Sequence, residues 1–434
     1  MRRRDFLSVA AQPLLAAKGR PNIVVILTDD LGWAELGCYG NRFNETPNLD
    51  ALAAQGVRFT QGYAPSPVCS PTRASYMTGQ YPARVGINDY LRANDPKFLS
   101  PDLPALPKLL AAAGYETALI GKWHLMGDYQ LRPGNPARHG FKRVICSETA
   151  YIGPGYYFPP YKHMPQVAPR KEGEYLTDRL NREALEWLSA NASKPFFLCL
   201  NHYAPHTRLA GKPDHVARYR AKPGAGKNRN NPELAAMLES IDEGVGALMK
   251  KLDELKVAGN TILIFTSDNG GELNVTSNAP LRGGKSMLYE GGIRVPLIVR
   301  WPGVAMKGVE CAAPVMTGDF YPTLLEAAGL RAPQEHIVDG VSFAPLLAKP
   351  DARLEREALY WYYPLEKPHF LGGRSSGAIR QGDWKLIEFY DKDEVELFNL
   401  RDDPGETRNL AGAEPARAQR MVANLRGWRG HFRP

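Results

Sequence analysis

The sequence NIVVILTDD, residues 22–30, decides the fold class of this chain of 434 residues. Its apolar, largely β-branched run ends abruptly in two aspartates, which is typical of a strand buried on both faces of a parallel sheet. Further apolar runs of this kind stand at residues 116–120, 195–200 and 261–266. Helical patterns separate the runs, at residues 48–55, 103–113, 176–190 and 232–255. The alternation predicts an α/β domain whose large, mostly parallel sheet is flanked by helices.

The character of the chain changes near residue 337. Short strand patterns follow, at residues 359–363, 377–380, 384–390 and 396–400, and then an amphipathic helix begins at residue 415. This pattern predicts a small antiparallel sheet with one helix, packed against the first domain. We therefore expect a catalytic α/β domain at residues 20–336 and a small C-terminal α+β subdomain at residues 337–434.

Residues 1–19, MRRRDFLSVAAQPLLAAKG, combine a basic start, a short apolar stretch and small residues. This combination is typical of a removable export signal, and Arg3–Leu7 resembles the twin-arginine signal of bacteria. An ordinary secretory signal or a basic tail is the alternative. The apolar stretch is too short for a membrane anchor. We expect a bacterial protein exported to the periplasm or beyond the cell.

Charge and cysteine content limit the function classes. The net charge of +8 suits an anionic substrate, although a solubility bias explains it equally well. Basic runs with interleaved aromatic residues are lacking, so we expect no nucleic-acid partner. The five cysteines are odd in number and widely spaced, which predicts neither a disulfide framework nor a zinc site.

Oxygen ligands follow two of the predicted strands. Asp29 and Asp30 end the first strand, and Asp268 and Asn269 end the strand that begins at Thr261. Each pair alone is typical of a turn or a helix cap. Because carboxyl ends of parallel strands share one edge of a sheet, the two pairs together predict a site for calcium or magnesium.

Cationic and titratable residues follow the same strands. They are Lys122 and His124 in GKWHL, His202 and His206 in NHYAPH, and Lys285 in RGGK. Any one alone is compatible with a solvated lysine or a hydrogen-bonded histidine. Five such groups beside a metal site predict an active site.

The segment PVCSPTRASYMTGQYPARVG, residues 67–86, contains the most informative cysteine. We expect Cys69 to begin a helix with Pro71 in its first turn and Arg73 one turn later. The positive end of the helix and Arg73 would both stabilise an anion beside Cys69. A plain cysteine hydrolase fits less well, because its thiol needs a base and gains nothing from an oxygen-ligated metal.

CSPTR resembles the CxPxR signature of type I sulfatases, in which the cysteine is converted to formylglycine. TGQYP resembles the extension of that signature. Other segments that resemble the family are NIVVILTDDLG, GKWHL, NHYAPH, FTSDNG, GKSMLYEGGIRVP, DWKLI and LFNLRDDPGETRNL. Two positions depart from the usual pattern, Met126 before Gly127 and Arg208 after Thr207, and they make the substrate harder to infer.

The resemblance implies an alkaline-phosphatase-like fold and the hydrolysis of sulfate esters. The substrate would be a sulfated small molecule or a sulfated saccharide. It implies metal ligation by Asp29, Asp30, Asp268, Asn269 and the modified Cys69, with calcium preferred over magnesium. It implies catalytic and sulfate-binding roles for Arg73, Lys122, His124, His206 and Lys285. A formylglycine-generating enzyme is then the partner that modifies Cys69.

In the implied mechanism, a hydrate of the aldehyde attacks sulfur and either His206 or Lys285 protonates the leaving alcohol. His124 then removes a proton to expel sulfate and restore the aldehyde. For substrate selection we expect His202, together with His369 and Arg374 in a rim loop at residues 366–380, to contact a sugar. Two alternatives stay open: a phosphodiester or phosphonate hydrolase on the same scaffold, and a metal-binding protein with an unmodified Cys69.

Overall fold

The computed structural model describes residues 19–127, 133–146, 157–161, 164, 167–227 and 229–432. The predicted export signal lies outside these residues except for Gly19. Within the described part of the chain, a mixed sheet of nine strands forms the centre of the molecule. Its strands are β1 (Asn22–Thr28), β2 (Val57–Tyr63), β3 (Glu116–Gly121), β4 (Arg143–Ile145), β5 (Phe196–Asn201), β6 (Thr261–Ser267), β7 (Arg294–Arg300), β8 (Val309–Cys311) and β9 (Val315–Met316).

The strand order is β4-β3-β5-β1-β6-β7-β2-β8, and β9 also pairs with β2. Strand β7 runs antiparallel to both β6 and β2, and the other pairs of this sheet are parallel. The four strands expected from the sequence lie side by side as β3, β5, β1 and β6. Strands β2 and β7 were not expected, because polar residues interrupt the first and a proline the second.

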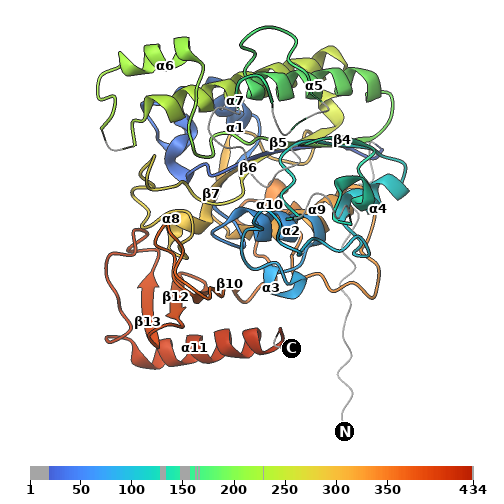
Figure 1. Cartoon of the computed structure of the whole chain (residues 1–434). Helices are drawn as coiled ribbons and strands as arrows, with labels where there is room; N and C mark the ends of the chain where they lie inside the picture. The colour runs from blue at the N-terminus through green and yellow to red at the C-terminus, as the bar shows by residue number, and fades with distance from the viewer. Residues whose placement is uncertain are drawn as a thin grey trace.

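Helices cover both faces of this sheet (Figure 1). On one face lie α1 (Pro47–Ala54), α5 (Leu176–Asn191) and α7 (Pro232–Glu254), whose apolar sides pack on Val24, Ile26 and neighbouring residues. On the other face lie α2 (Cys69–Thr78), α4 (Leu106–Ala112) and α9 (Phe320–Ala327). This arrangement confirms the predicted α/β architecture. No helix in the described ranges has the length and apolarity needed to span a membrane.

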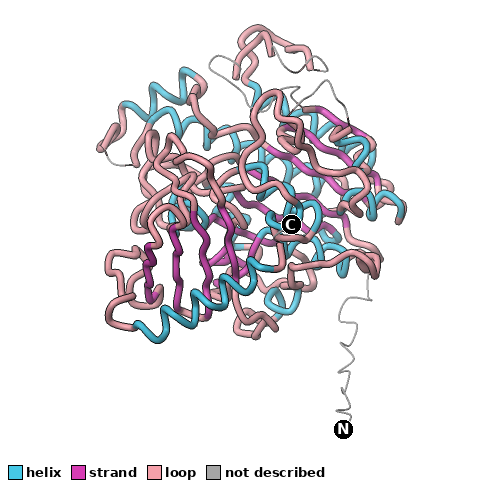
Figure 2. Tube along the Cα trace, turned by 60° about the horizontal axis from the view of Figure 1, so that its bottom comes forward, coloured by secondary structure: helices cyan, strands magenta, loops and turns pink. Residues whose placement is uncertain are grey.

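A second sheet lies at one end of the molecule, where α11 (Pro415–Gly430) crosses it (Figure 2). Its antiparallel strands are β10 (Leu359–Tyr363), β11 (Ser376–Gln381), β12 (Trp384–Phe389) and β13 (Glu394–Asn399). One face packs on α11 through Ile379 and Leu386. The other face packs on the end of β2 and on Leu288 and Ile293 of the large domain. The predicted small sheet with one helix is confirmed, whereas the boundary at residue 337 stays a prediction.

The small sheet holds the segment that contains Lys285. Trp361 is fully buried, and its indole N–H donates to the Ala64 carbonyl at 2.8 Å. Lys385 is also fully buried and bonds to Glu290 at 2.9 Å and to Glu406 at 2.8 Å. Because unpaired buried charges are costly, these ion pairs fix the β12 strand against residues 285–293. The C-terminal sheet therefore helps to position one side of the predicted active site.

Glu35 connects two loops that leave the sheet beside the predicted metal ligands. It is almost completely buried, accepts a hydrogen bond from Asn44 Nδ2 at 2.6 Å, and is also bonded by the Thr276 hydroxyl. Burial raises the pKa of the Glu35 carboxyl from 4.5 to about 7, against the opposing effect of the two hydrogen bonds.

This raised pKa predicts a pH-dependent contribution to stability. The folded protein binds the Glu35 proton more tightly than the unfolded chain, so the contribution is present below pH 4.5 and is lost as pH rises through about 7. Glu35→Gln should remove that loss, which amounts to about 3 kcal/mol at most. Urea unfolding of both proteins between pH 5 and 8 measures it. The exposed control Glu355→Gln should keep the wild-type profile, and parallel profiles for wild type and Glu35→Gln would contradict the assignment.

Candidate active site

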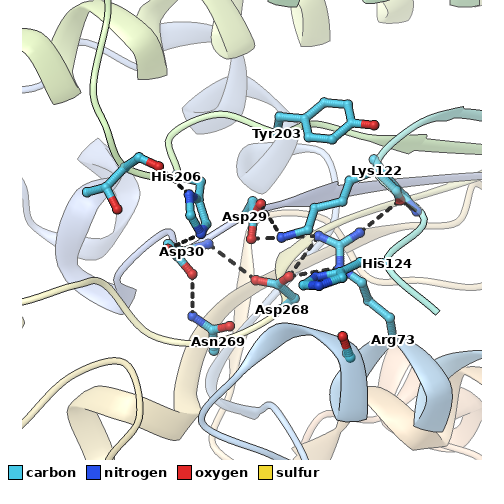
Figure 3. Close-up of polar contacts among 12 residues, drawn as sticks. Asp29, Asp30, Arg73, Lys122, His124, Tyr203, His206, Asp268 and Asn269 are labelled. Atoms are coloured by element: carbon cyan, nitrogen blue, oxygen red, sulfur yellow. Dashed lines mark hydrogen bonds and ion pairs between the residues drawn. The ribbon is translucent and has the colours of Figure 1, made fainter. Parts of the chain in front are cut away.

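The carboxyl ends of four neighbouring strands and the start of α2 meet at one edge of the large sheet. Strands β1, β6 and β3 deliver Asp29, Asp268 and Lys122, and the chain after β2 delivers Cys69 at the first position of α2. The side chains of Asp29, Asp268 and Lys122 point toward one another from separate elements (Figure 3). The structure thus brings together the residues that the sequence analysis assigned to one strand edge.

One glycine makes this convergence possible. Gly121 ends β3 with a φ of +107°, and a Cβ there would lie 1.8 Å from the Asn201 carbonyl oxygen. Only glycine fits such a close approach. Strands β3 and β5 can therefore end side by side, and Lys122 turns toward β1.

Each of the three buried aspartates is bonded to a cation. Lys122 Nζ donates to Asp29 Oδ2 at 2.6 Å, and Lys285 Nζ donates to Asp30 Oδ2 at 2.6 Å. Arg73 Nε and Nη2 donate to Asp268 Oδ2 at 2.9 and 2.7 Å. The three aspartates are each at most 4% exposed, and the three cations balance the mutual repulsion of their carboxylates.

The pKa values of two of these aspartates are shifted in opposite directions. Burial and the nearby Asp29 raise the pKa of Asp268 to about 6, although Arg73 opposes them. Burial alone would also raise the pKa of Asp30, but Lys285, His206 and Lys122 together hold it below its ordinary value. A divalent cation beside these groups would favour the ionised form of all three.

Two further oxygens at this place have no hydrogen-bond donor within the described residues. They are Asp29 Oδ1 and Asn269 Oδ1, and both are fully buried. Asn269 Nδ2 donates to Asp30 Oδ1 at 2.7 Å, which turns its carbonyl oxygen away from Asp30. A buried oxygen without a donor is costly, and a cation removes the cost. The donor set is made of hard oxygens, so these residues fit calcium or magnesium.

Cys69 lies beside these carboxylates. Its sulfur is within 4.8 Å of carboxylate oxygens of Asp29 and Asp268, and its side chain is 2% exposed. Burial raises the pKa of the Cys69 thiol to about 11, although Lys122 and Lys285 oppose the shift. As predicted, Cys69 begins α2 with Pro71 in the first turn. An unmodified Cys69 is a poor thiolate nucleophile in these surroundings.

Two histidines border the same place in their neutral forms. His124 Nε2 lies 2.8 Å from the Leu91 carbonyl, so it donates, and the buried Nδ1 is left as an unprotonated acceptor. Burial and then Lys122 hold the pKa of His124 well below 6.5. His206 Nδ1 donates to the Thr207 carbonyl, so His206 Nε2 accepts from Lys285 Nζ at 3.0 Å. Burial lowers the pKa of His206 to about 4.

A cleft of about 460 Å³ opens above Cys69. Its lining includes His124, His206 and Lys285, together with Arg208 and Glu272. The sequence analysis missed Glu272, whose only signal was its position four residues after Asp268. Glu272 is 7% exposed and accepts a hydrogen bond from the Thr207 hydroxyl at 2.8 Å.

The structure corrects two of the predicted substrate contacts. His202 does not line the cleft: its ring is 1% exposed, and burial lowers its pKa to about 3. Arg374 lies in the predicted rim segment but does not line the cleft, and its guanidinium is bound by Asp391 at 2.8 Å and by Glu394 at 3.0 Å. The last five residues of that segment belong to strand β11. His369 does line the cleft, where substrate contact stays a prediction.

Comparisons with known proteins agree with this geometry. The sequence profile described as "Sulfatase" matches residues 21–330, and the profile "N-sulphoglucosamine sulphohydrolase, C-terminal" matches residues 284–427. The chain belongs to the sulfatase family. It is a sulfuric ester hydrolase with the alkaline-phosphatase-like fold of that family.

The relatives of this sulfatase include steryl-sulfatase of Homo sapiens, which is 32% identical and aligns over 80% of this chain and 73% of its own length. N-acetylgalactosamine-6-sulfatase of Sus scrofa is 34% identical, over 82% of this chain and 71% of its own length. The solved structure of Ps i-CgsB in complex with k-i-k-neocarrahexaose superposes with a TM-score of 0.84 at 31% identity, covering 94% of this chain and 93% of that chain.

Because Asp29 Oδ1 and Asn269 Oδ1 are buried without a hydrogen-bond donor, we expect a divalent cation to stabilise the folded protein. Protein treated with a chelator should melt at a lower temperature, and added calcium or magnesium should restore about 3 kcal/mol of stability at a hundredfold excess over the dissociation constant. Asp29→Asn or Asn269→Ala should lose most of this response in thermal scans. The control Asp339→Asn, which alters an ion pair with Arg84 away from the cleft, should respond like wild type. An identical response in all four proteins would rule out this cation site.

Proposed function

We propose that this sulfatase hydrolyses sulfate esters of carbohydrates, with a formylglycine made from Cys69 and a calcium or magnesium ion. The ion would be held by Asp29, Asp30, Asp268 and Asn269. The observation that carries the proposal is the pair of buried, donorless oxygens beside Cys69, at a place where cations and carboxylates balance. Addition of a divalent ion would leave an excess of positive charge, which favours binding of an anionic sulfate ester.

Two groups that the gene does not encode would supply part of the chemistry: a divalent cation and the aldehyde of residue 69. The cation would act as a Lewis acid on sulfate oxygens. The hydrated aldehyde of residue 69 would supply the attacking hydroxyl. A dedicated formylglycine-generating enzyme would have to reach Cys69 before its burial in the folded chain.

The chain's own residues would then bind sulfate and move protons. Arg73, Lys122 and Lys285 surround Cys69 and would bind the sulfate oxygens while charge shifts toward the leaving group. Lys285 is the better candidate for protonating the leaving alkoxide, because it is bonded to both Asp30 and His206 and lines the cleft. Burial by itself would lower the pKa of Lys285, but the nearby negative groups, Asp30 foremost, together raise it, so Lys285 enters the reaction protonated. His124 presents its unprotonated Nδ1 and would accept the proton that accompanies release of sulfate.

The charged lining of the cleft favours a sugar over a sterol as the alcohol part. Glu272 and the exposed Arg208 line the cleft, and a sterol would cover the Arg208 guanidinium without offering it a hydrogen-bond acceptor. A sugar hydroxyl would supply that acceptor and would also donate to the Glu272 carboxylate. The oligosaccharide named with the Ps i-CgsB structure and the substrate in the name of N-acetylgalactosamine-6-sulfatase support the same class.

Cys69→Ala should lower sulfate release from an aryl sulfate and from a panel of sulfated sugars by about a thousandfold or more. Its unfolding free energy should fall by only about 1 kcal/mol, because the side chain loses a single atom. The matched control is Cys199→Ala, since Cys199 is equally buried but lies in the core against Tyr76. Wild-type activity in Cys69→Ala, or faster hydrolysis of the corresponding aryl phosphonate by the wild type, would overturn the proposed function.

A further inference from the structure

A second hollow of about 590 Å³ lies beside the cleft above Cys69. Both spaces are lined by Tyr90, Leu91, Arg92, His369 and Phe370. Since these residues border both spaces, the hollow adjoins the cleft, and a unit joined to one in the cleft would lie at its border. The hollow is within the size range of sites for small organic ligands.

Each domain supplies one wall of the hollow. Residues 87–97, which follow α3 (Pro82–Val85), form the wall on the large domain, and residues 364–370, between β10 and β11, form the wall on the small domain. His369 fixes the second wall: its backbone N–H donates to the Gly373 carbonyl at 2.8 Å, and its Nδ1 accepts from Leu371 N–H at 3.1 Å. The hollow is thus shaped by hydrogen-bonded backbone and not by side chains alone.

An exposed aromatic ring stands on the border between the cleft and the hollow. Phe370 is 80% exposed, more than any other large apolar side chain in the described part of the protein. Its ring stacks on His369 with centroids 4.4 Å apart and planes inclined by 27°. A flat ring suits the apolar face of a sugar, which presents C–H groups.

The charged side chains that line the hollow have no excess of either sign. Its basic side chains are Arg92, Lys97 and Lys367, and its acidic side chains are Asp89, Asp95 and Glu366. Arg92 is paired with Asp89 at 3.0 Å, whereas Glu366 and Lys367 have no ion pair among the residues that the structure describes. Neighbouring hydrogen-bond donors and acceptors can bind sugar hydroxyl groups. Because the hollow has no net positive charge, it would bind a second sulfate group only weakly.

We propose that this hollow is a subsite for an uncharged, hydroxyl-bearing sugar unit joined to the unit whose sulfate lies over Cys69. The substrate class is then an oligosaccharide or a polysaccharide, and not a sulfated monosaccharide or a sterol sulfate. The proposal rests on the proposed function for the cleft. Phe370 packs against the sugar ring near the junction, while Glu366 and Lys367 bind hydroxyl groups farther into the hollow.

The test compares substrates that differ only in length. A sulfated N-acetylgalactosamine and the di- and tetrasaccharides that contain the same sulfated unit are hydrolysed by the wild type, and kcat/KM is measured for each. We expect kcat/KM to rise about tenfold from the monosaccharide to the disaccharide, which corresponds to about 1.4 kcal/mol of added transition-state binding.

Variants connect this gain to the hollow. The double variant Glu366→Ala/Lys367→Ala should lower kcat/KM about tenfold more for the disaccharide than for the monosaccharide. The control is Lys392→Ala, an exposed lysine in the turn between β12 and β13 that lines neither space. It should keep the wild-type ratio. Equal kcat/KM for all lengths, or an equal loss on both substrates in the double variant, would overturn the proposal.

Two further experiments distinguish a failure of the subsite proposal from a failure of the proposed function. Disaccharides with and without a second sulfate on the neighbouring unit test its charge, and a gain restricted to the doubly sulfated compound would contradict an uncharged ligand. Calorimetric binding of the same compounds to Cys69→Ala tests the hollow without turnover. If the wild type desulfates none of these compounds, the proposed function fails. In that case, about tenfold tighter binding of the disaccharide than of the monosaccharide to Cys69→Ala would still support the subsite. Equal binding of the two compounds would refute it.

Discussion

The structure depends on one electrostatic constraint: three aspartates are buried within a few ångströms of one another at the carboxyl ends of two strands. Like charges in a low-dielectric interior repel strongly, so each carboxylate needs its own compensation. Lys122, Lys285 and Arg73 provide it, and they come from three separate segments of the chain. The sheet order, the close approach at Gly121 and the docking of the C-terminal sheet all serve to bring these cations to the aspartates.

The same balance explains how an anionic ester can be both bound and cleaved. Cations that are held by carboxylates are already oriented before a ligand arrives, so little reorganisation is needed during the reaction. Neutral histidines complete the arrangement, since burial prevents His124 and His206 from adding positive charge. Proton transfer and charge stabilisation are thereby assigned to different side chains.

Much of this architecture could be predicted from the sequence. The strands next to the site are continuous apolar runs, and the residues that follow them define the edge where they meet, so Asp29, Asp268, Lys122 and His206 were predicted together. The antiparallel strand β7 was missed because a proline interrupts its apolar run, which argues against a central strand. Arg374 and His202 were misassigned because composition near a pocket does not show which way a side chain points. Glu272 and the second hollow depend on loops from distant parts of the chain, and no local pattern predicts such contacts.

The central claim is that residue 69 acts as a formylglycine inside this cluster of charges. Tryptic digestion yields the peptide of residues 59–73, in which Cys69 is the only cysteine. Mass spectrometry of this peptide from active protein, produced in a host with a formylglycine-generating enzyme, tests the claim most directly. The account predicts a peptide lighter than the encoded one that reacts with aldehyde reagents. Active protein whose Cys69 is an intact thiol, alkylated in full, would contradict it.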